Sequence, residues 1–140
     1  HDLHFTKLME ICHWAKEKHP HMILVVENPV GLMKSMPLMQ RLQEDFGLND
    51  PVEVNYCAFG REERKATNLW TNHAKLRDAL SVFTCEKRCQ RSQNHTSIRG
   101  NTSKFDFSAI PEPLAEEVAD TVHSIFKLKD IRRKTQAAEP

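Results

Sequence analysis

The sequence predicts a mixed α/β fold, chiefly because a helical pattern is followed by a short, unbroken apolar run. Apolar residues recur at i, i+3, i+4 and i+7 over about residues 3–18, which predicts an amphipathic helix that stops before Pro20. The residues on this apolar face are Leu8, Ile11, Cys12 and Ala15. The run over residues 22–26 is typical of a strand covered on both faces, and it ends in Glu27 and Asn28. Because ligands of open α/β sheets bind beyond the carboxyl ends of strands, we expect function at this edge.

The next elements are shorter. Residues 36–46 predict a helix that ends at Gly47, and the alternation over residues 52–56 predicts a half-buried strand. Residues 68–71 are a weaker strand candidate. The charged run between these two strands, over residues 61–65, is expected to be a solvated connection.

The carboxyl-terminal part predicts a basic loop, a helix and a tail. Residues 85–104 carry five basic side chains and a single acid, with little periodicity, which predicts an irregular basic insertion. Residues 111–126 place apolar side chains on one helical face, with proline in the first turn. Residues 127–140 are basic and then small and polar, so we expect a flexible tail after a domain that spans residues 1–126.

Composition narrows the functional classes. With 140 residues and 16.2 kDa, the chain is long enough for one domain or for one half of a larger domain. Its net charge of +1 provides no whole-protein attraction to nucleic acid, so such a partner must be inferred locally. No apolar run approaches the roughly 20 residues that cross a bilayer, and no signal-peptide pattern is present. Four scattered cysteines do not make a disulfide scaffold. We therefore expect an intracellular protein without a membrane partner.

Glu27 is the first candidate for chemistry. A glutamate that a buried strand delivers to the sheet edge can donate a proton when its surroundings raise its pKa. The alternative is structural: Glu27 and Asn28 cap the strand and hydrogen-bond the turn that begins at Pro29. The pattern alone leaves both interpretations open.

A second candidate is the array Cys85-x3-Cys89-x5-His95 in the basic segment. Thiolate and imidazole are the ligands that zinc prefers, but a structural site needs a fourth ligand, for which Cys57 and His73 are available without any spacing argument. The alternative is a pair of loop thiols without metal. The basic side chains around the array are either phosphate contacts or solvated charges.

Three stretches, in this order and spacing, resemble the carboxyl-terminal half of DNA cytosine-5 methyltransferases, particularly the compact bacteriophage-like members. Residues 25–32, with Glu27-Asn28-Pro29, look like the family's Glu-Asn motif. Residues 55–72 resemble its Tyr-Cys-Gln-Tyr-Gly and Trp-Thr-Asn stretch, and residues 108–119 resemble its terminal motif. The resemblance covers roughly residues 2–126 and implies the second half of a Rossmann-like domain that depends on S-adenosylmethionine.

In this family a Pro-Cys thiolate attacks C6 of a flipped cytosine, and the Glu of the Glu-Asn motif contacts N3 and the amino group. The resemblance therefore implies a catalytic role for Glu27, with Asn28 shaping the same pocket, and DNA as partner. It further implies cofactor contacts, nucleic-acid contacts and, in a eukaryote, a nuclear location. The implied cofactor-binding residues are Ser108, Ile110 and Pro111, and the implied nucleic-acid-binding residues are Arg61, Arg64, Lys65, Lys87, Arg88, Arg91 and Arg99.

The chain also departs from the family pattern. No cysteine follows a proline and no Gly-x-Gly cofactor loop is present, so the chain alone is expected to be inactive. Ala58 stands where the phage-like pattern has Gln, and Glu63 where it commonly has Arg, which puts that motif's contacts in question. Two hypotheses follow. The chain is the carboxyl-terminal portion of a methyltransferase whose amino-terminal half lies upstream or on a partner subunit, or it is a non-catalytic nucleic-acid-binding or assembly module.

Overall fold

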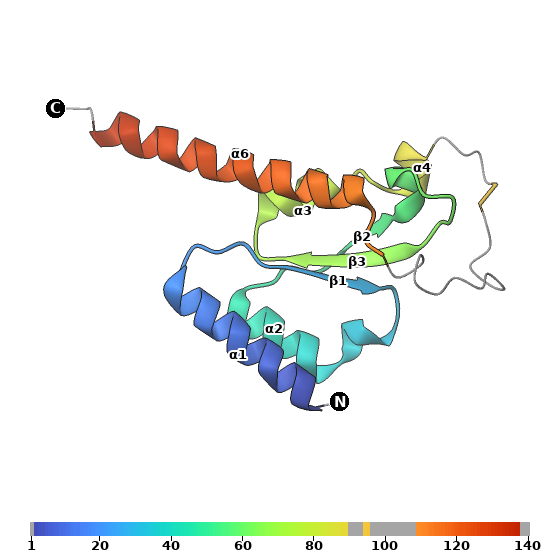
Figure 1. Cartoon of the computed structure of the whole chain (residues 1–140), viewed down its shortest axis with the longest axis horizontal. Helices are drawn as coiled ribbons and strands as arrows, with labels where there is room; N and C mark the ends of the chain where they lie inside the picture. Colours follow the sequence, from blue (N-terminus) through green and yellow to red (C-terminus); the bar gives the residue numbers. More distant parts are fainter. Residues whose placement is uncertain (1, 90–93, 96–108, 138–140) are drawn as a thin grey trace.

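A computed structural model describes the chain over residues 2–89, 94–95 and 109–137. The fold is mixed α/β, as the sequence predicts, and it is built on a three-stranded antiparallel sheet (Figure 1). The helices are α1 (Asp2–Lys18), α2 (Pro37–Phe46), α3 (Ala74–Leu80), α4 (Cys85–Arg88) and α6 (Glu112–Ala137), the 3-10 turns are η1 (Leu32–Ser35) and η2 (Tyr56–Phe59), and the strands are β1 (Val25–Pro29), β2 (Val52–Asn55) and β3 (Ala66–Thr71). None of the described helices is long and apolar enough to cross a membrane.

The sheet has β3 at its centre, in the order β1-β3-β2. β3 is antiparallel to both neighbours, with Glu27 opposite Leu69 and Asn55 opposite Ala66. Because both edge strands oppose β3, they run parallel to each other, and α2 lies on the connection between them. The carboxyl ends of β1 and β2 therefore meet at the same end of the sheet.

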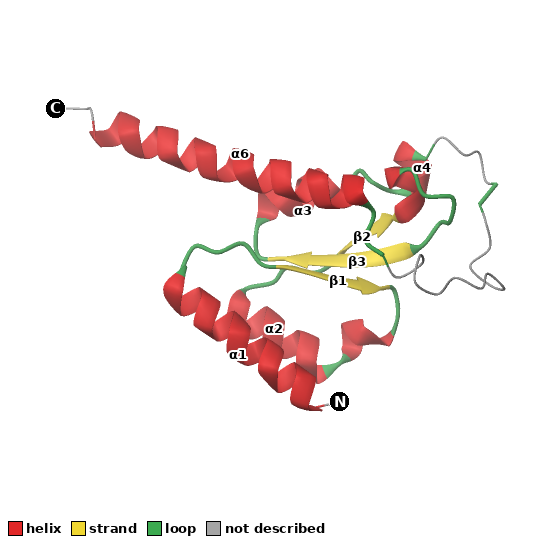
Figure 2. Ribbon diagram, viewed as in Figure 1, coloured by secondary structure: helices red, strands yellow, loops and turns green. Residues whose placement is uncertain are grey.

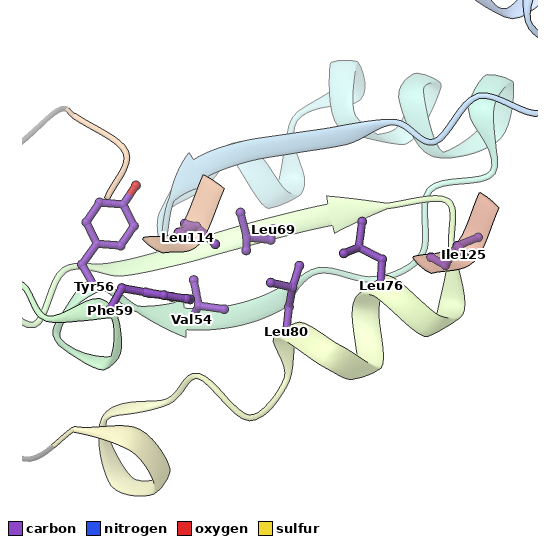
Figure 3. Packing of buried hydrophobic residues seen from close by; sticks show 8 residues of the cluster. All are labelled: Val54, Tyr56, Phe59, Leu69, Leu76, Leu80, Leu114 and Ile125. Atoms are coloured by element: carbon purple, nitrogen blue, oxygen red, sulfur yellow. The ribbon is translucent and has the colours of Figure 1, made fainter. Parts of the chain in front are cut away.

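Helices cover both faces of the sheet (Figure 2). α1 and α2 pack on one face around a core that includes Met39, Leu42 and Trp70, which are at most 1% exposed. α3 and α6 pack on the other face, where Leu76 and Leu80 are fully buried. Figure 3 shows this second core, which lies between the sheet and the two helices. Its buried members are Val54, Tyr56, Phe59, Leu69, Leu76, Leu80, Leu114 and Ile125.

Alternation along β1 sends successive side chains to the two cores. Val25 packs against the α3/α6 core and Val26 against the α1/α2 core. Glu27 follows on the side of Val25, and Asn28 on the side of Val26. This two-faced coverage agrees with the apolar run in the sequence, although the strand begins at Val25 rather than Met22.

The amino-terminal helices agree with the sequence in position, but the apolar face of α1 differs from the prediction. Cys12 is buried together with Met9, whereas Leu8 and Ile11 are 41% and 61% exposed. α1 ends at Lys18, before Pro20, and α2 ends at Phe46. Gly47 then adopts φ 67° and its N–H donates to the Gln43 carbonyl over 2.8 Å, which closes α2 with a left-handed cap.

The later elements differ from the prediction in four ways. β3 is the central strand and begins at Ala66, although residues 68–71 give only a weak strand signal. α3 was not predicted, and α4 occupies the start of the segment that we expected to be a loop. α6 continues to Ala137, well past Phe126. Long straight-chain and basic side chains favour a helix even where no partner face covers it.

Candidate functional site

The sheet brings together Glu27, the middle residue of β1, and Tyr56, which directly follows β2. Tyr56, the first residue of η2, is fully buried, and its hydroxyl donates a hydrogen bond to Oε1 of the half-buried Glu27 over 3.0 Å. Burial, followed by the hydrogen bond and negative charge of Glu27, raises the pKa of Tyr56 to about 12. The tyrosine therefore stays protonated and orients the carboxylate. Within the described part of the chain, Oε2 of Glu27 forms no hydrogen bond and is available to a ligand.

Asn28 lies on the opposite face of β1. Its Oδ1 accepts a hydrogen bond from the indole N–H of Trp70 over 2.7 Å, and its Nδ2 donates to the Pro29 carbonyl over 2.8 Å. Both Asn28 and Trp70 are buried. The structure therefore does not place Asn28 beside the Glu27 carboxylate, and the contacts of Asn28 are those of a residue that fixes the strand end and its turn.

The site also contains a cluster of sulfur and nitrogen ligands, which we call the Cys3His cluster: Cys57, Cys85, Cys89 and His95. Cys57 lies in η2, directly after Tyr56. Cys85 begins α4 and Cys89 directly follows its last residue, so the short helix holds the two cysteines near each other. The array that the sequence singles out thus acquires its fourth member from a segment far away in the sequence.

Asn55 attaches α4 to the sheet. Its Oδ1 accepts a hydrogen bond from the Cys85 N–H over 2.8 Å, and its own N–H donates to the Phe83 carbonyl over 3.0 Å. Asn55 is buried, so both bonds are shielded from water. Its position between β2 and η2 brings the two cysteines of α4 to Cys57.

The ligand atoms of the Cys3His cluster lie within 4.8 Å of one another. His95 Nε2 is 3.6 Å from Cys85 Sγ and 3.4 Å from Cys89 Sγ. In a tetrahedral zinc site with ordinary bond lengths, a sulfur and a nitrogen ligand are about 3.6 Å apart. All four cysteines of the chain are free thiols. The cluster could therefore hold a metal ion such as zinc.

Cys57 is the most buried ligand, with 4% of its surface exposed. Burial, followed by hydrogen bonds and charges from Cys85 and Cys89, raises the pKa of the Cys57 thiol to about 12. Three thiolates cannot be crowded together without a cation, which is the physical reason that such a cluster suits a divalent metal.

His73 is the fourth-ligand candidate that the structure does not bring to the cluster. It follows the carboxyl end of β3, which lies at the opposite end of the sheet from Cys57 because the strands are antiparallel. No sequence spacing distinguishes the two candidates, because the contact depends on how β2 and α4 are placed in space.

The basic candidates fall into two groups, of which the first follows η2. Arg61 Nε donates to Oε1 of Glu63 over 2.6 Å, and Glu63 is only 5% exposed, so residues 61–65 are not uniformly solvated as we expected. Arg64 is exposed, and the ammonium of Lys65 lies 4.7 Å from the centre of the Tyr56 ring.

The second group begins on α4. Lys87 and Arg88 are exposed, and the Arg88 guanidinium lies 5.5 Å from the centre of the Phe83 ring. Of the cofactor candidates, Ile110 is exposed and Pro111 is buried directly before α6. Arg91, Arg99 and Ser108 lie outside the described residues.

Neither a protein-family model, nor a curated protein, nor a solved structure matches this chain.

Proposed function

We propose that this chain is the carboxyl-terminal portion of a DNA cytosine-5 methyltransferase, in which Glu27 contacts the target base. The observation that carries the proposal is the Glu27–Tyr56 pair, in which the antiparallel sheet brings a side chain of β1 to the residue that directly follows β2. One oxygen of Glu27 is held by a buried donor, and the other accepts no hydrogen bond from the residues that the structure describes. This arrangement suits a carboxyl group that must meet a planar base in a fixed orientation.

The chemistry of Glu27 follows from this geometry. A protonated carboxyl at N3 of cytosine withdraws electrons from the ring and makes addition at C6 easier. The Tyr56 hydroxyl fixes Oε1, so the proton would be donated from Oε2. S-adenosylmethionine, when bound, supplies the methyl group. The nucleophilic thiolate and the cofactor loop would come from the amino-terminal half, since no cysteine of this chain follows a proline.

The form of β1 supports a larger, Rossmann-like sheet in the whole protein. Val25 and Val26 pack against two different cores, as in a strand that lies inside a sheet, yet β1 is an edge strand of the described residues. An edge strand with both faces covered is a template for further pairing. We infer that the sheet continues past β1 with a strand from the amino-terminal half or from a partner subunit.

The test is Glu27→Gln in the natural protein that contains this chain, with methyl transfer to cytosine-containing DNA as the readout. Removal of a general acid costs about 10²–10⁴-fold in rate, and the glutamine keeps the hydrogen bond from Tyr56. The matched control is Glu17→Gln on the exposed face of α1, which should leave the rate unchanged. A near-normal rate for Glu27→Gln would remove the assignment.

A second candidate function is a non-catalytic nucleic-acid-binding module. Glu63 favours it, because a buried acid paired with Arg61 stands where the resembling family commonly has an arginine. This function predicts that the chain alone binds DNA with a strong salt dependence and that Lys87→Ala and Arg88→Ala each reduce the salt slope by about 1. Fluorescence anisotropy at several salt concentrations measures both quantities. Binding that does not respond to salt would exclude it.

A further inference from the structure

We propose that the Cys3His cluster binds one Zn²⁺ as a closed structural site, which fixes α4 to η2 and thereby holds Tyr56 against Glu27. The site differs from the methyltransferase function in chemistry and in its test. Zinc binding needs neither DNA nor S-adenosylmethionine, so the result of the zinc experiment does not depend on the proposed function.

The donor set argues for zinc and for a structural role. Three sulfurs and one imidazole nitrogen form one of the ligand sets of structural zinc sites, and the ligand atoms already lie within 4.8 Å of one another. The His95 Nε2 distances of 3.4 and 3.6 Å to two sulfurs suit a common metal ion between them. Four protein ligands complete a tetrahedron, so no coordination position remains for a substrate.

α4 supplies the second argument, because it needs a source of stability. It has four residues and none of them is buried, so apolar packing does not account for its helical form. A single helical turn is also unfavourable by itself, because nucleation orders several residues for one hydrogen bond. Its attachments are the Asn55 side chain and the cluster. A metal bond to Cys85 and Cys89 would join the two ends of α4 to each other and to the sheet.

The third argument concerns position. Cys57 directly follows Tyr56, the residue whose hydroxyl holds Glu27. The Tyr56 N–H donates to the carbonyl of Lys65, the residue directly before β3, over 3.0 Å. η2 is therefore attached to the start of β3 through Tyr56 and to the cluster through Cys57. Tyr56 is thus a positioning residue, and the metal would act on Glu27 only through it.

The first experiment measures zinc in the full chain, purified under reducing conditions without added chelator. We expect one zinc per chain, and loss of that zinc in Cys57→Ser and in Cys89→Ser. The matched controls are Cys12→Ser, whose thiol lies in the α1/α2 core, and His123→Ala on the exposed face of α6; both should keep the metal. Replacement by Co²⁺ should give the intense visible bands of a tetrahedral site with thiolate ligands.

The second experiment uses the unmodified chain, because the variants can fail to fold. We expect that a chelator increases amide hydrogen exchange in η2 and α4 and that added Zn²⁺ restores protection, whereas α1 and α2 do not change. Three results would overturn the proposal: a folded chain that binds no Zn²⁺ when it is supplied, Cys57→Ser with full zinc content, or a chelator effect that is absent from η2 and α4.

Discussion

The hydrogen bond between Asn28 and Trp70 gives a quantitative test of the sheet. Asn28→Ala removes the acceptor of the indole N–H, and Trp70 is only 1% exposed, so water does not replace it without a rearrangement. A buried donor left without a partner costs about 1–3 kcal/mol, and the Pro29 carbonyl loses its donor as well. We expect the free energy of unfolding to fall by about 2 kcal/mol. With a urea dependence of about 2 kcal/mol per molar, the unfolding midpoint moves down by about 1 M.

A double-mutant cycle separates the bond from other effects of the substitutions. Trp70→Phe removes the donor and some packing, and in the double variant neither partner is left unsatisfied. The double variant should therefore be about 1 kcal/mol more stable than the sum of the single effects predicts. Urea unfolding followed by circular dichroism measures all four proteins, with Gln40→Ala on the exposed side of α2 as a surface control. Single effects that simply add, within about 0.3–0.5 kcal/mol, would refute the reasoning.

Two further predictions concern stability at other positions. Gly47→Ala places a side chain at φ 67°, where no atom would clash with it, so we expect only the backbone cost of about 1 kcal/mol; a neutral result in urea unfolding would contradict the left-handed cap. Burial lowers the pKa of His73, and the charges of Lys129 and Lys75 lower it further, while its Nδ1 is buried with no hydrogen-bond partner among the described residues. The folded state therefore binds this proton less tightly than the unfolded state, so stability should fall as pH drops below about 6.5, and His73→Asn should flatten that fall in thermal scans from pH 7 to pH 5.

Local patterns predicted the elements whose evidence is local. The positions of α1 and α2 follow from the spacing of their apolar residues, and Gly47 marks the end of α2, but the spacing misplaces the buried face of α1, because Leu8 and Ile11 are exposed. β1 follows only in part, because it begins at Val25 and continues to Pro29 through the polar residues that we expected after the strand. α3 is short and carries only two buried residues, so its periodicity is too brief to stand out from a loop.

β3 was the hardest strand to predict because its burial does not follow its hydrophobicity. Thr67, Asn68 and Thr71 are buried polar residues, and the central position of the strand covers them from both sides. The Thr71 hydroxyl accepts a hydrogen bond from the His73 N–H over 3.3 Å, whereas the Thr67 hydroxyl has no partner among the described residues, and the sequence indicates neither arrangement. Glu63 is a second example, because it is buried although the residues around it in the sequence have the composition of a solvated segment.

The candidate site was predictable in part. Glu27 and the array of Cys85, Cys89 and His95 are evident in the sequence, because strand ends and ligand spacing are local features. Tyr56 as the partner of Glu27, and Cys57 as the fourth member of the cluster, depend on the antiparallel pairing of β2 with β3. Predicting either contact requires knowledge of which residues far apart in the sequence lie side by side in the fold.

The central place of β3 governs when the sheet can form during synthesis. β1 and β2 leave the ribosome first, yet each pairs with β3, with Val25 opposite Thr71 and Val52 opposite Leu69. Until residue 71 has emerged, neither earlier strand can complete its pairing with β3, and the valines of β1 remain exposed on that side to chaperones or to aggregation. Closing such distant pairs is slow, because the entropy of the intervening chain is lost before the contacts form. A nascent chain halted before Ala66 should therefore contain helices but neither the β1–β3 nor the β2–β3 pairing.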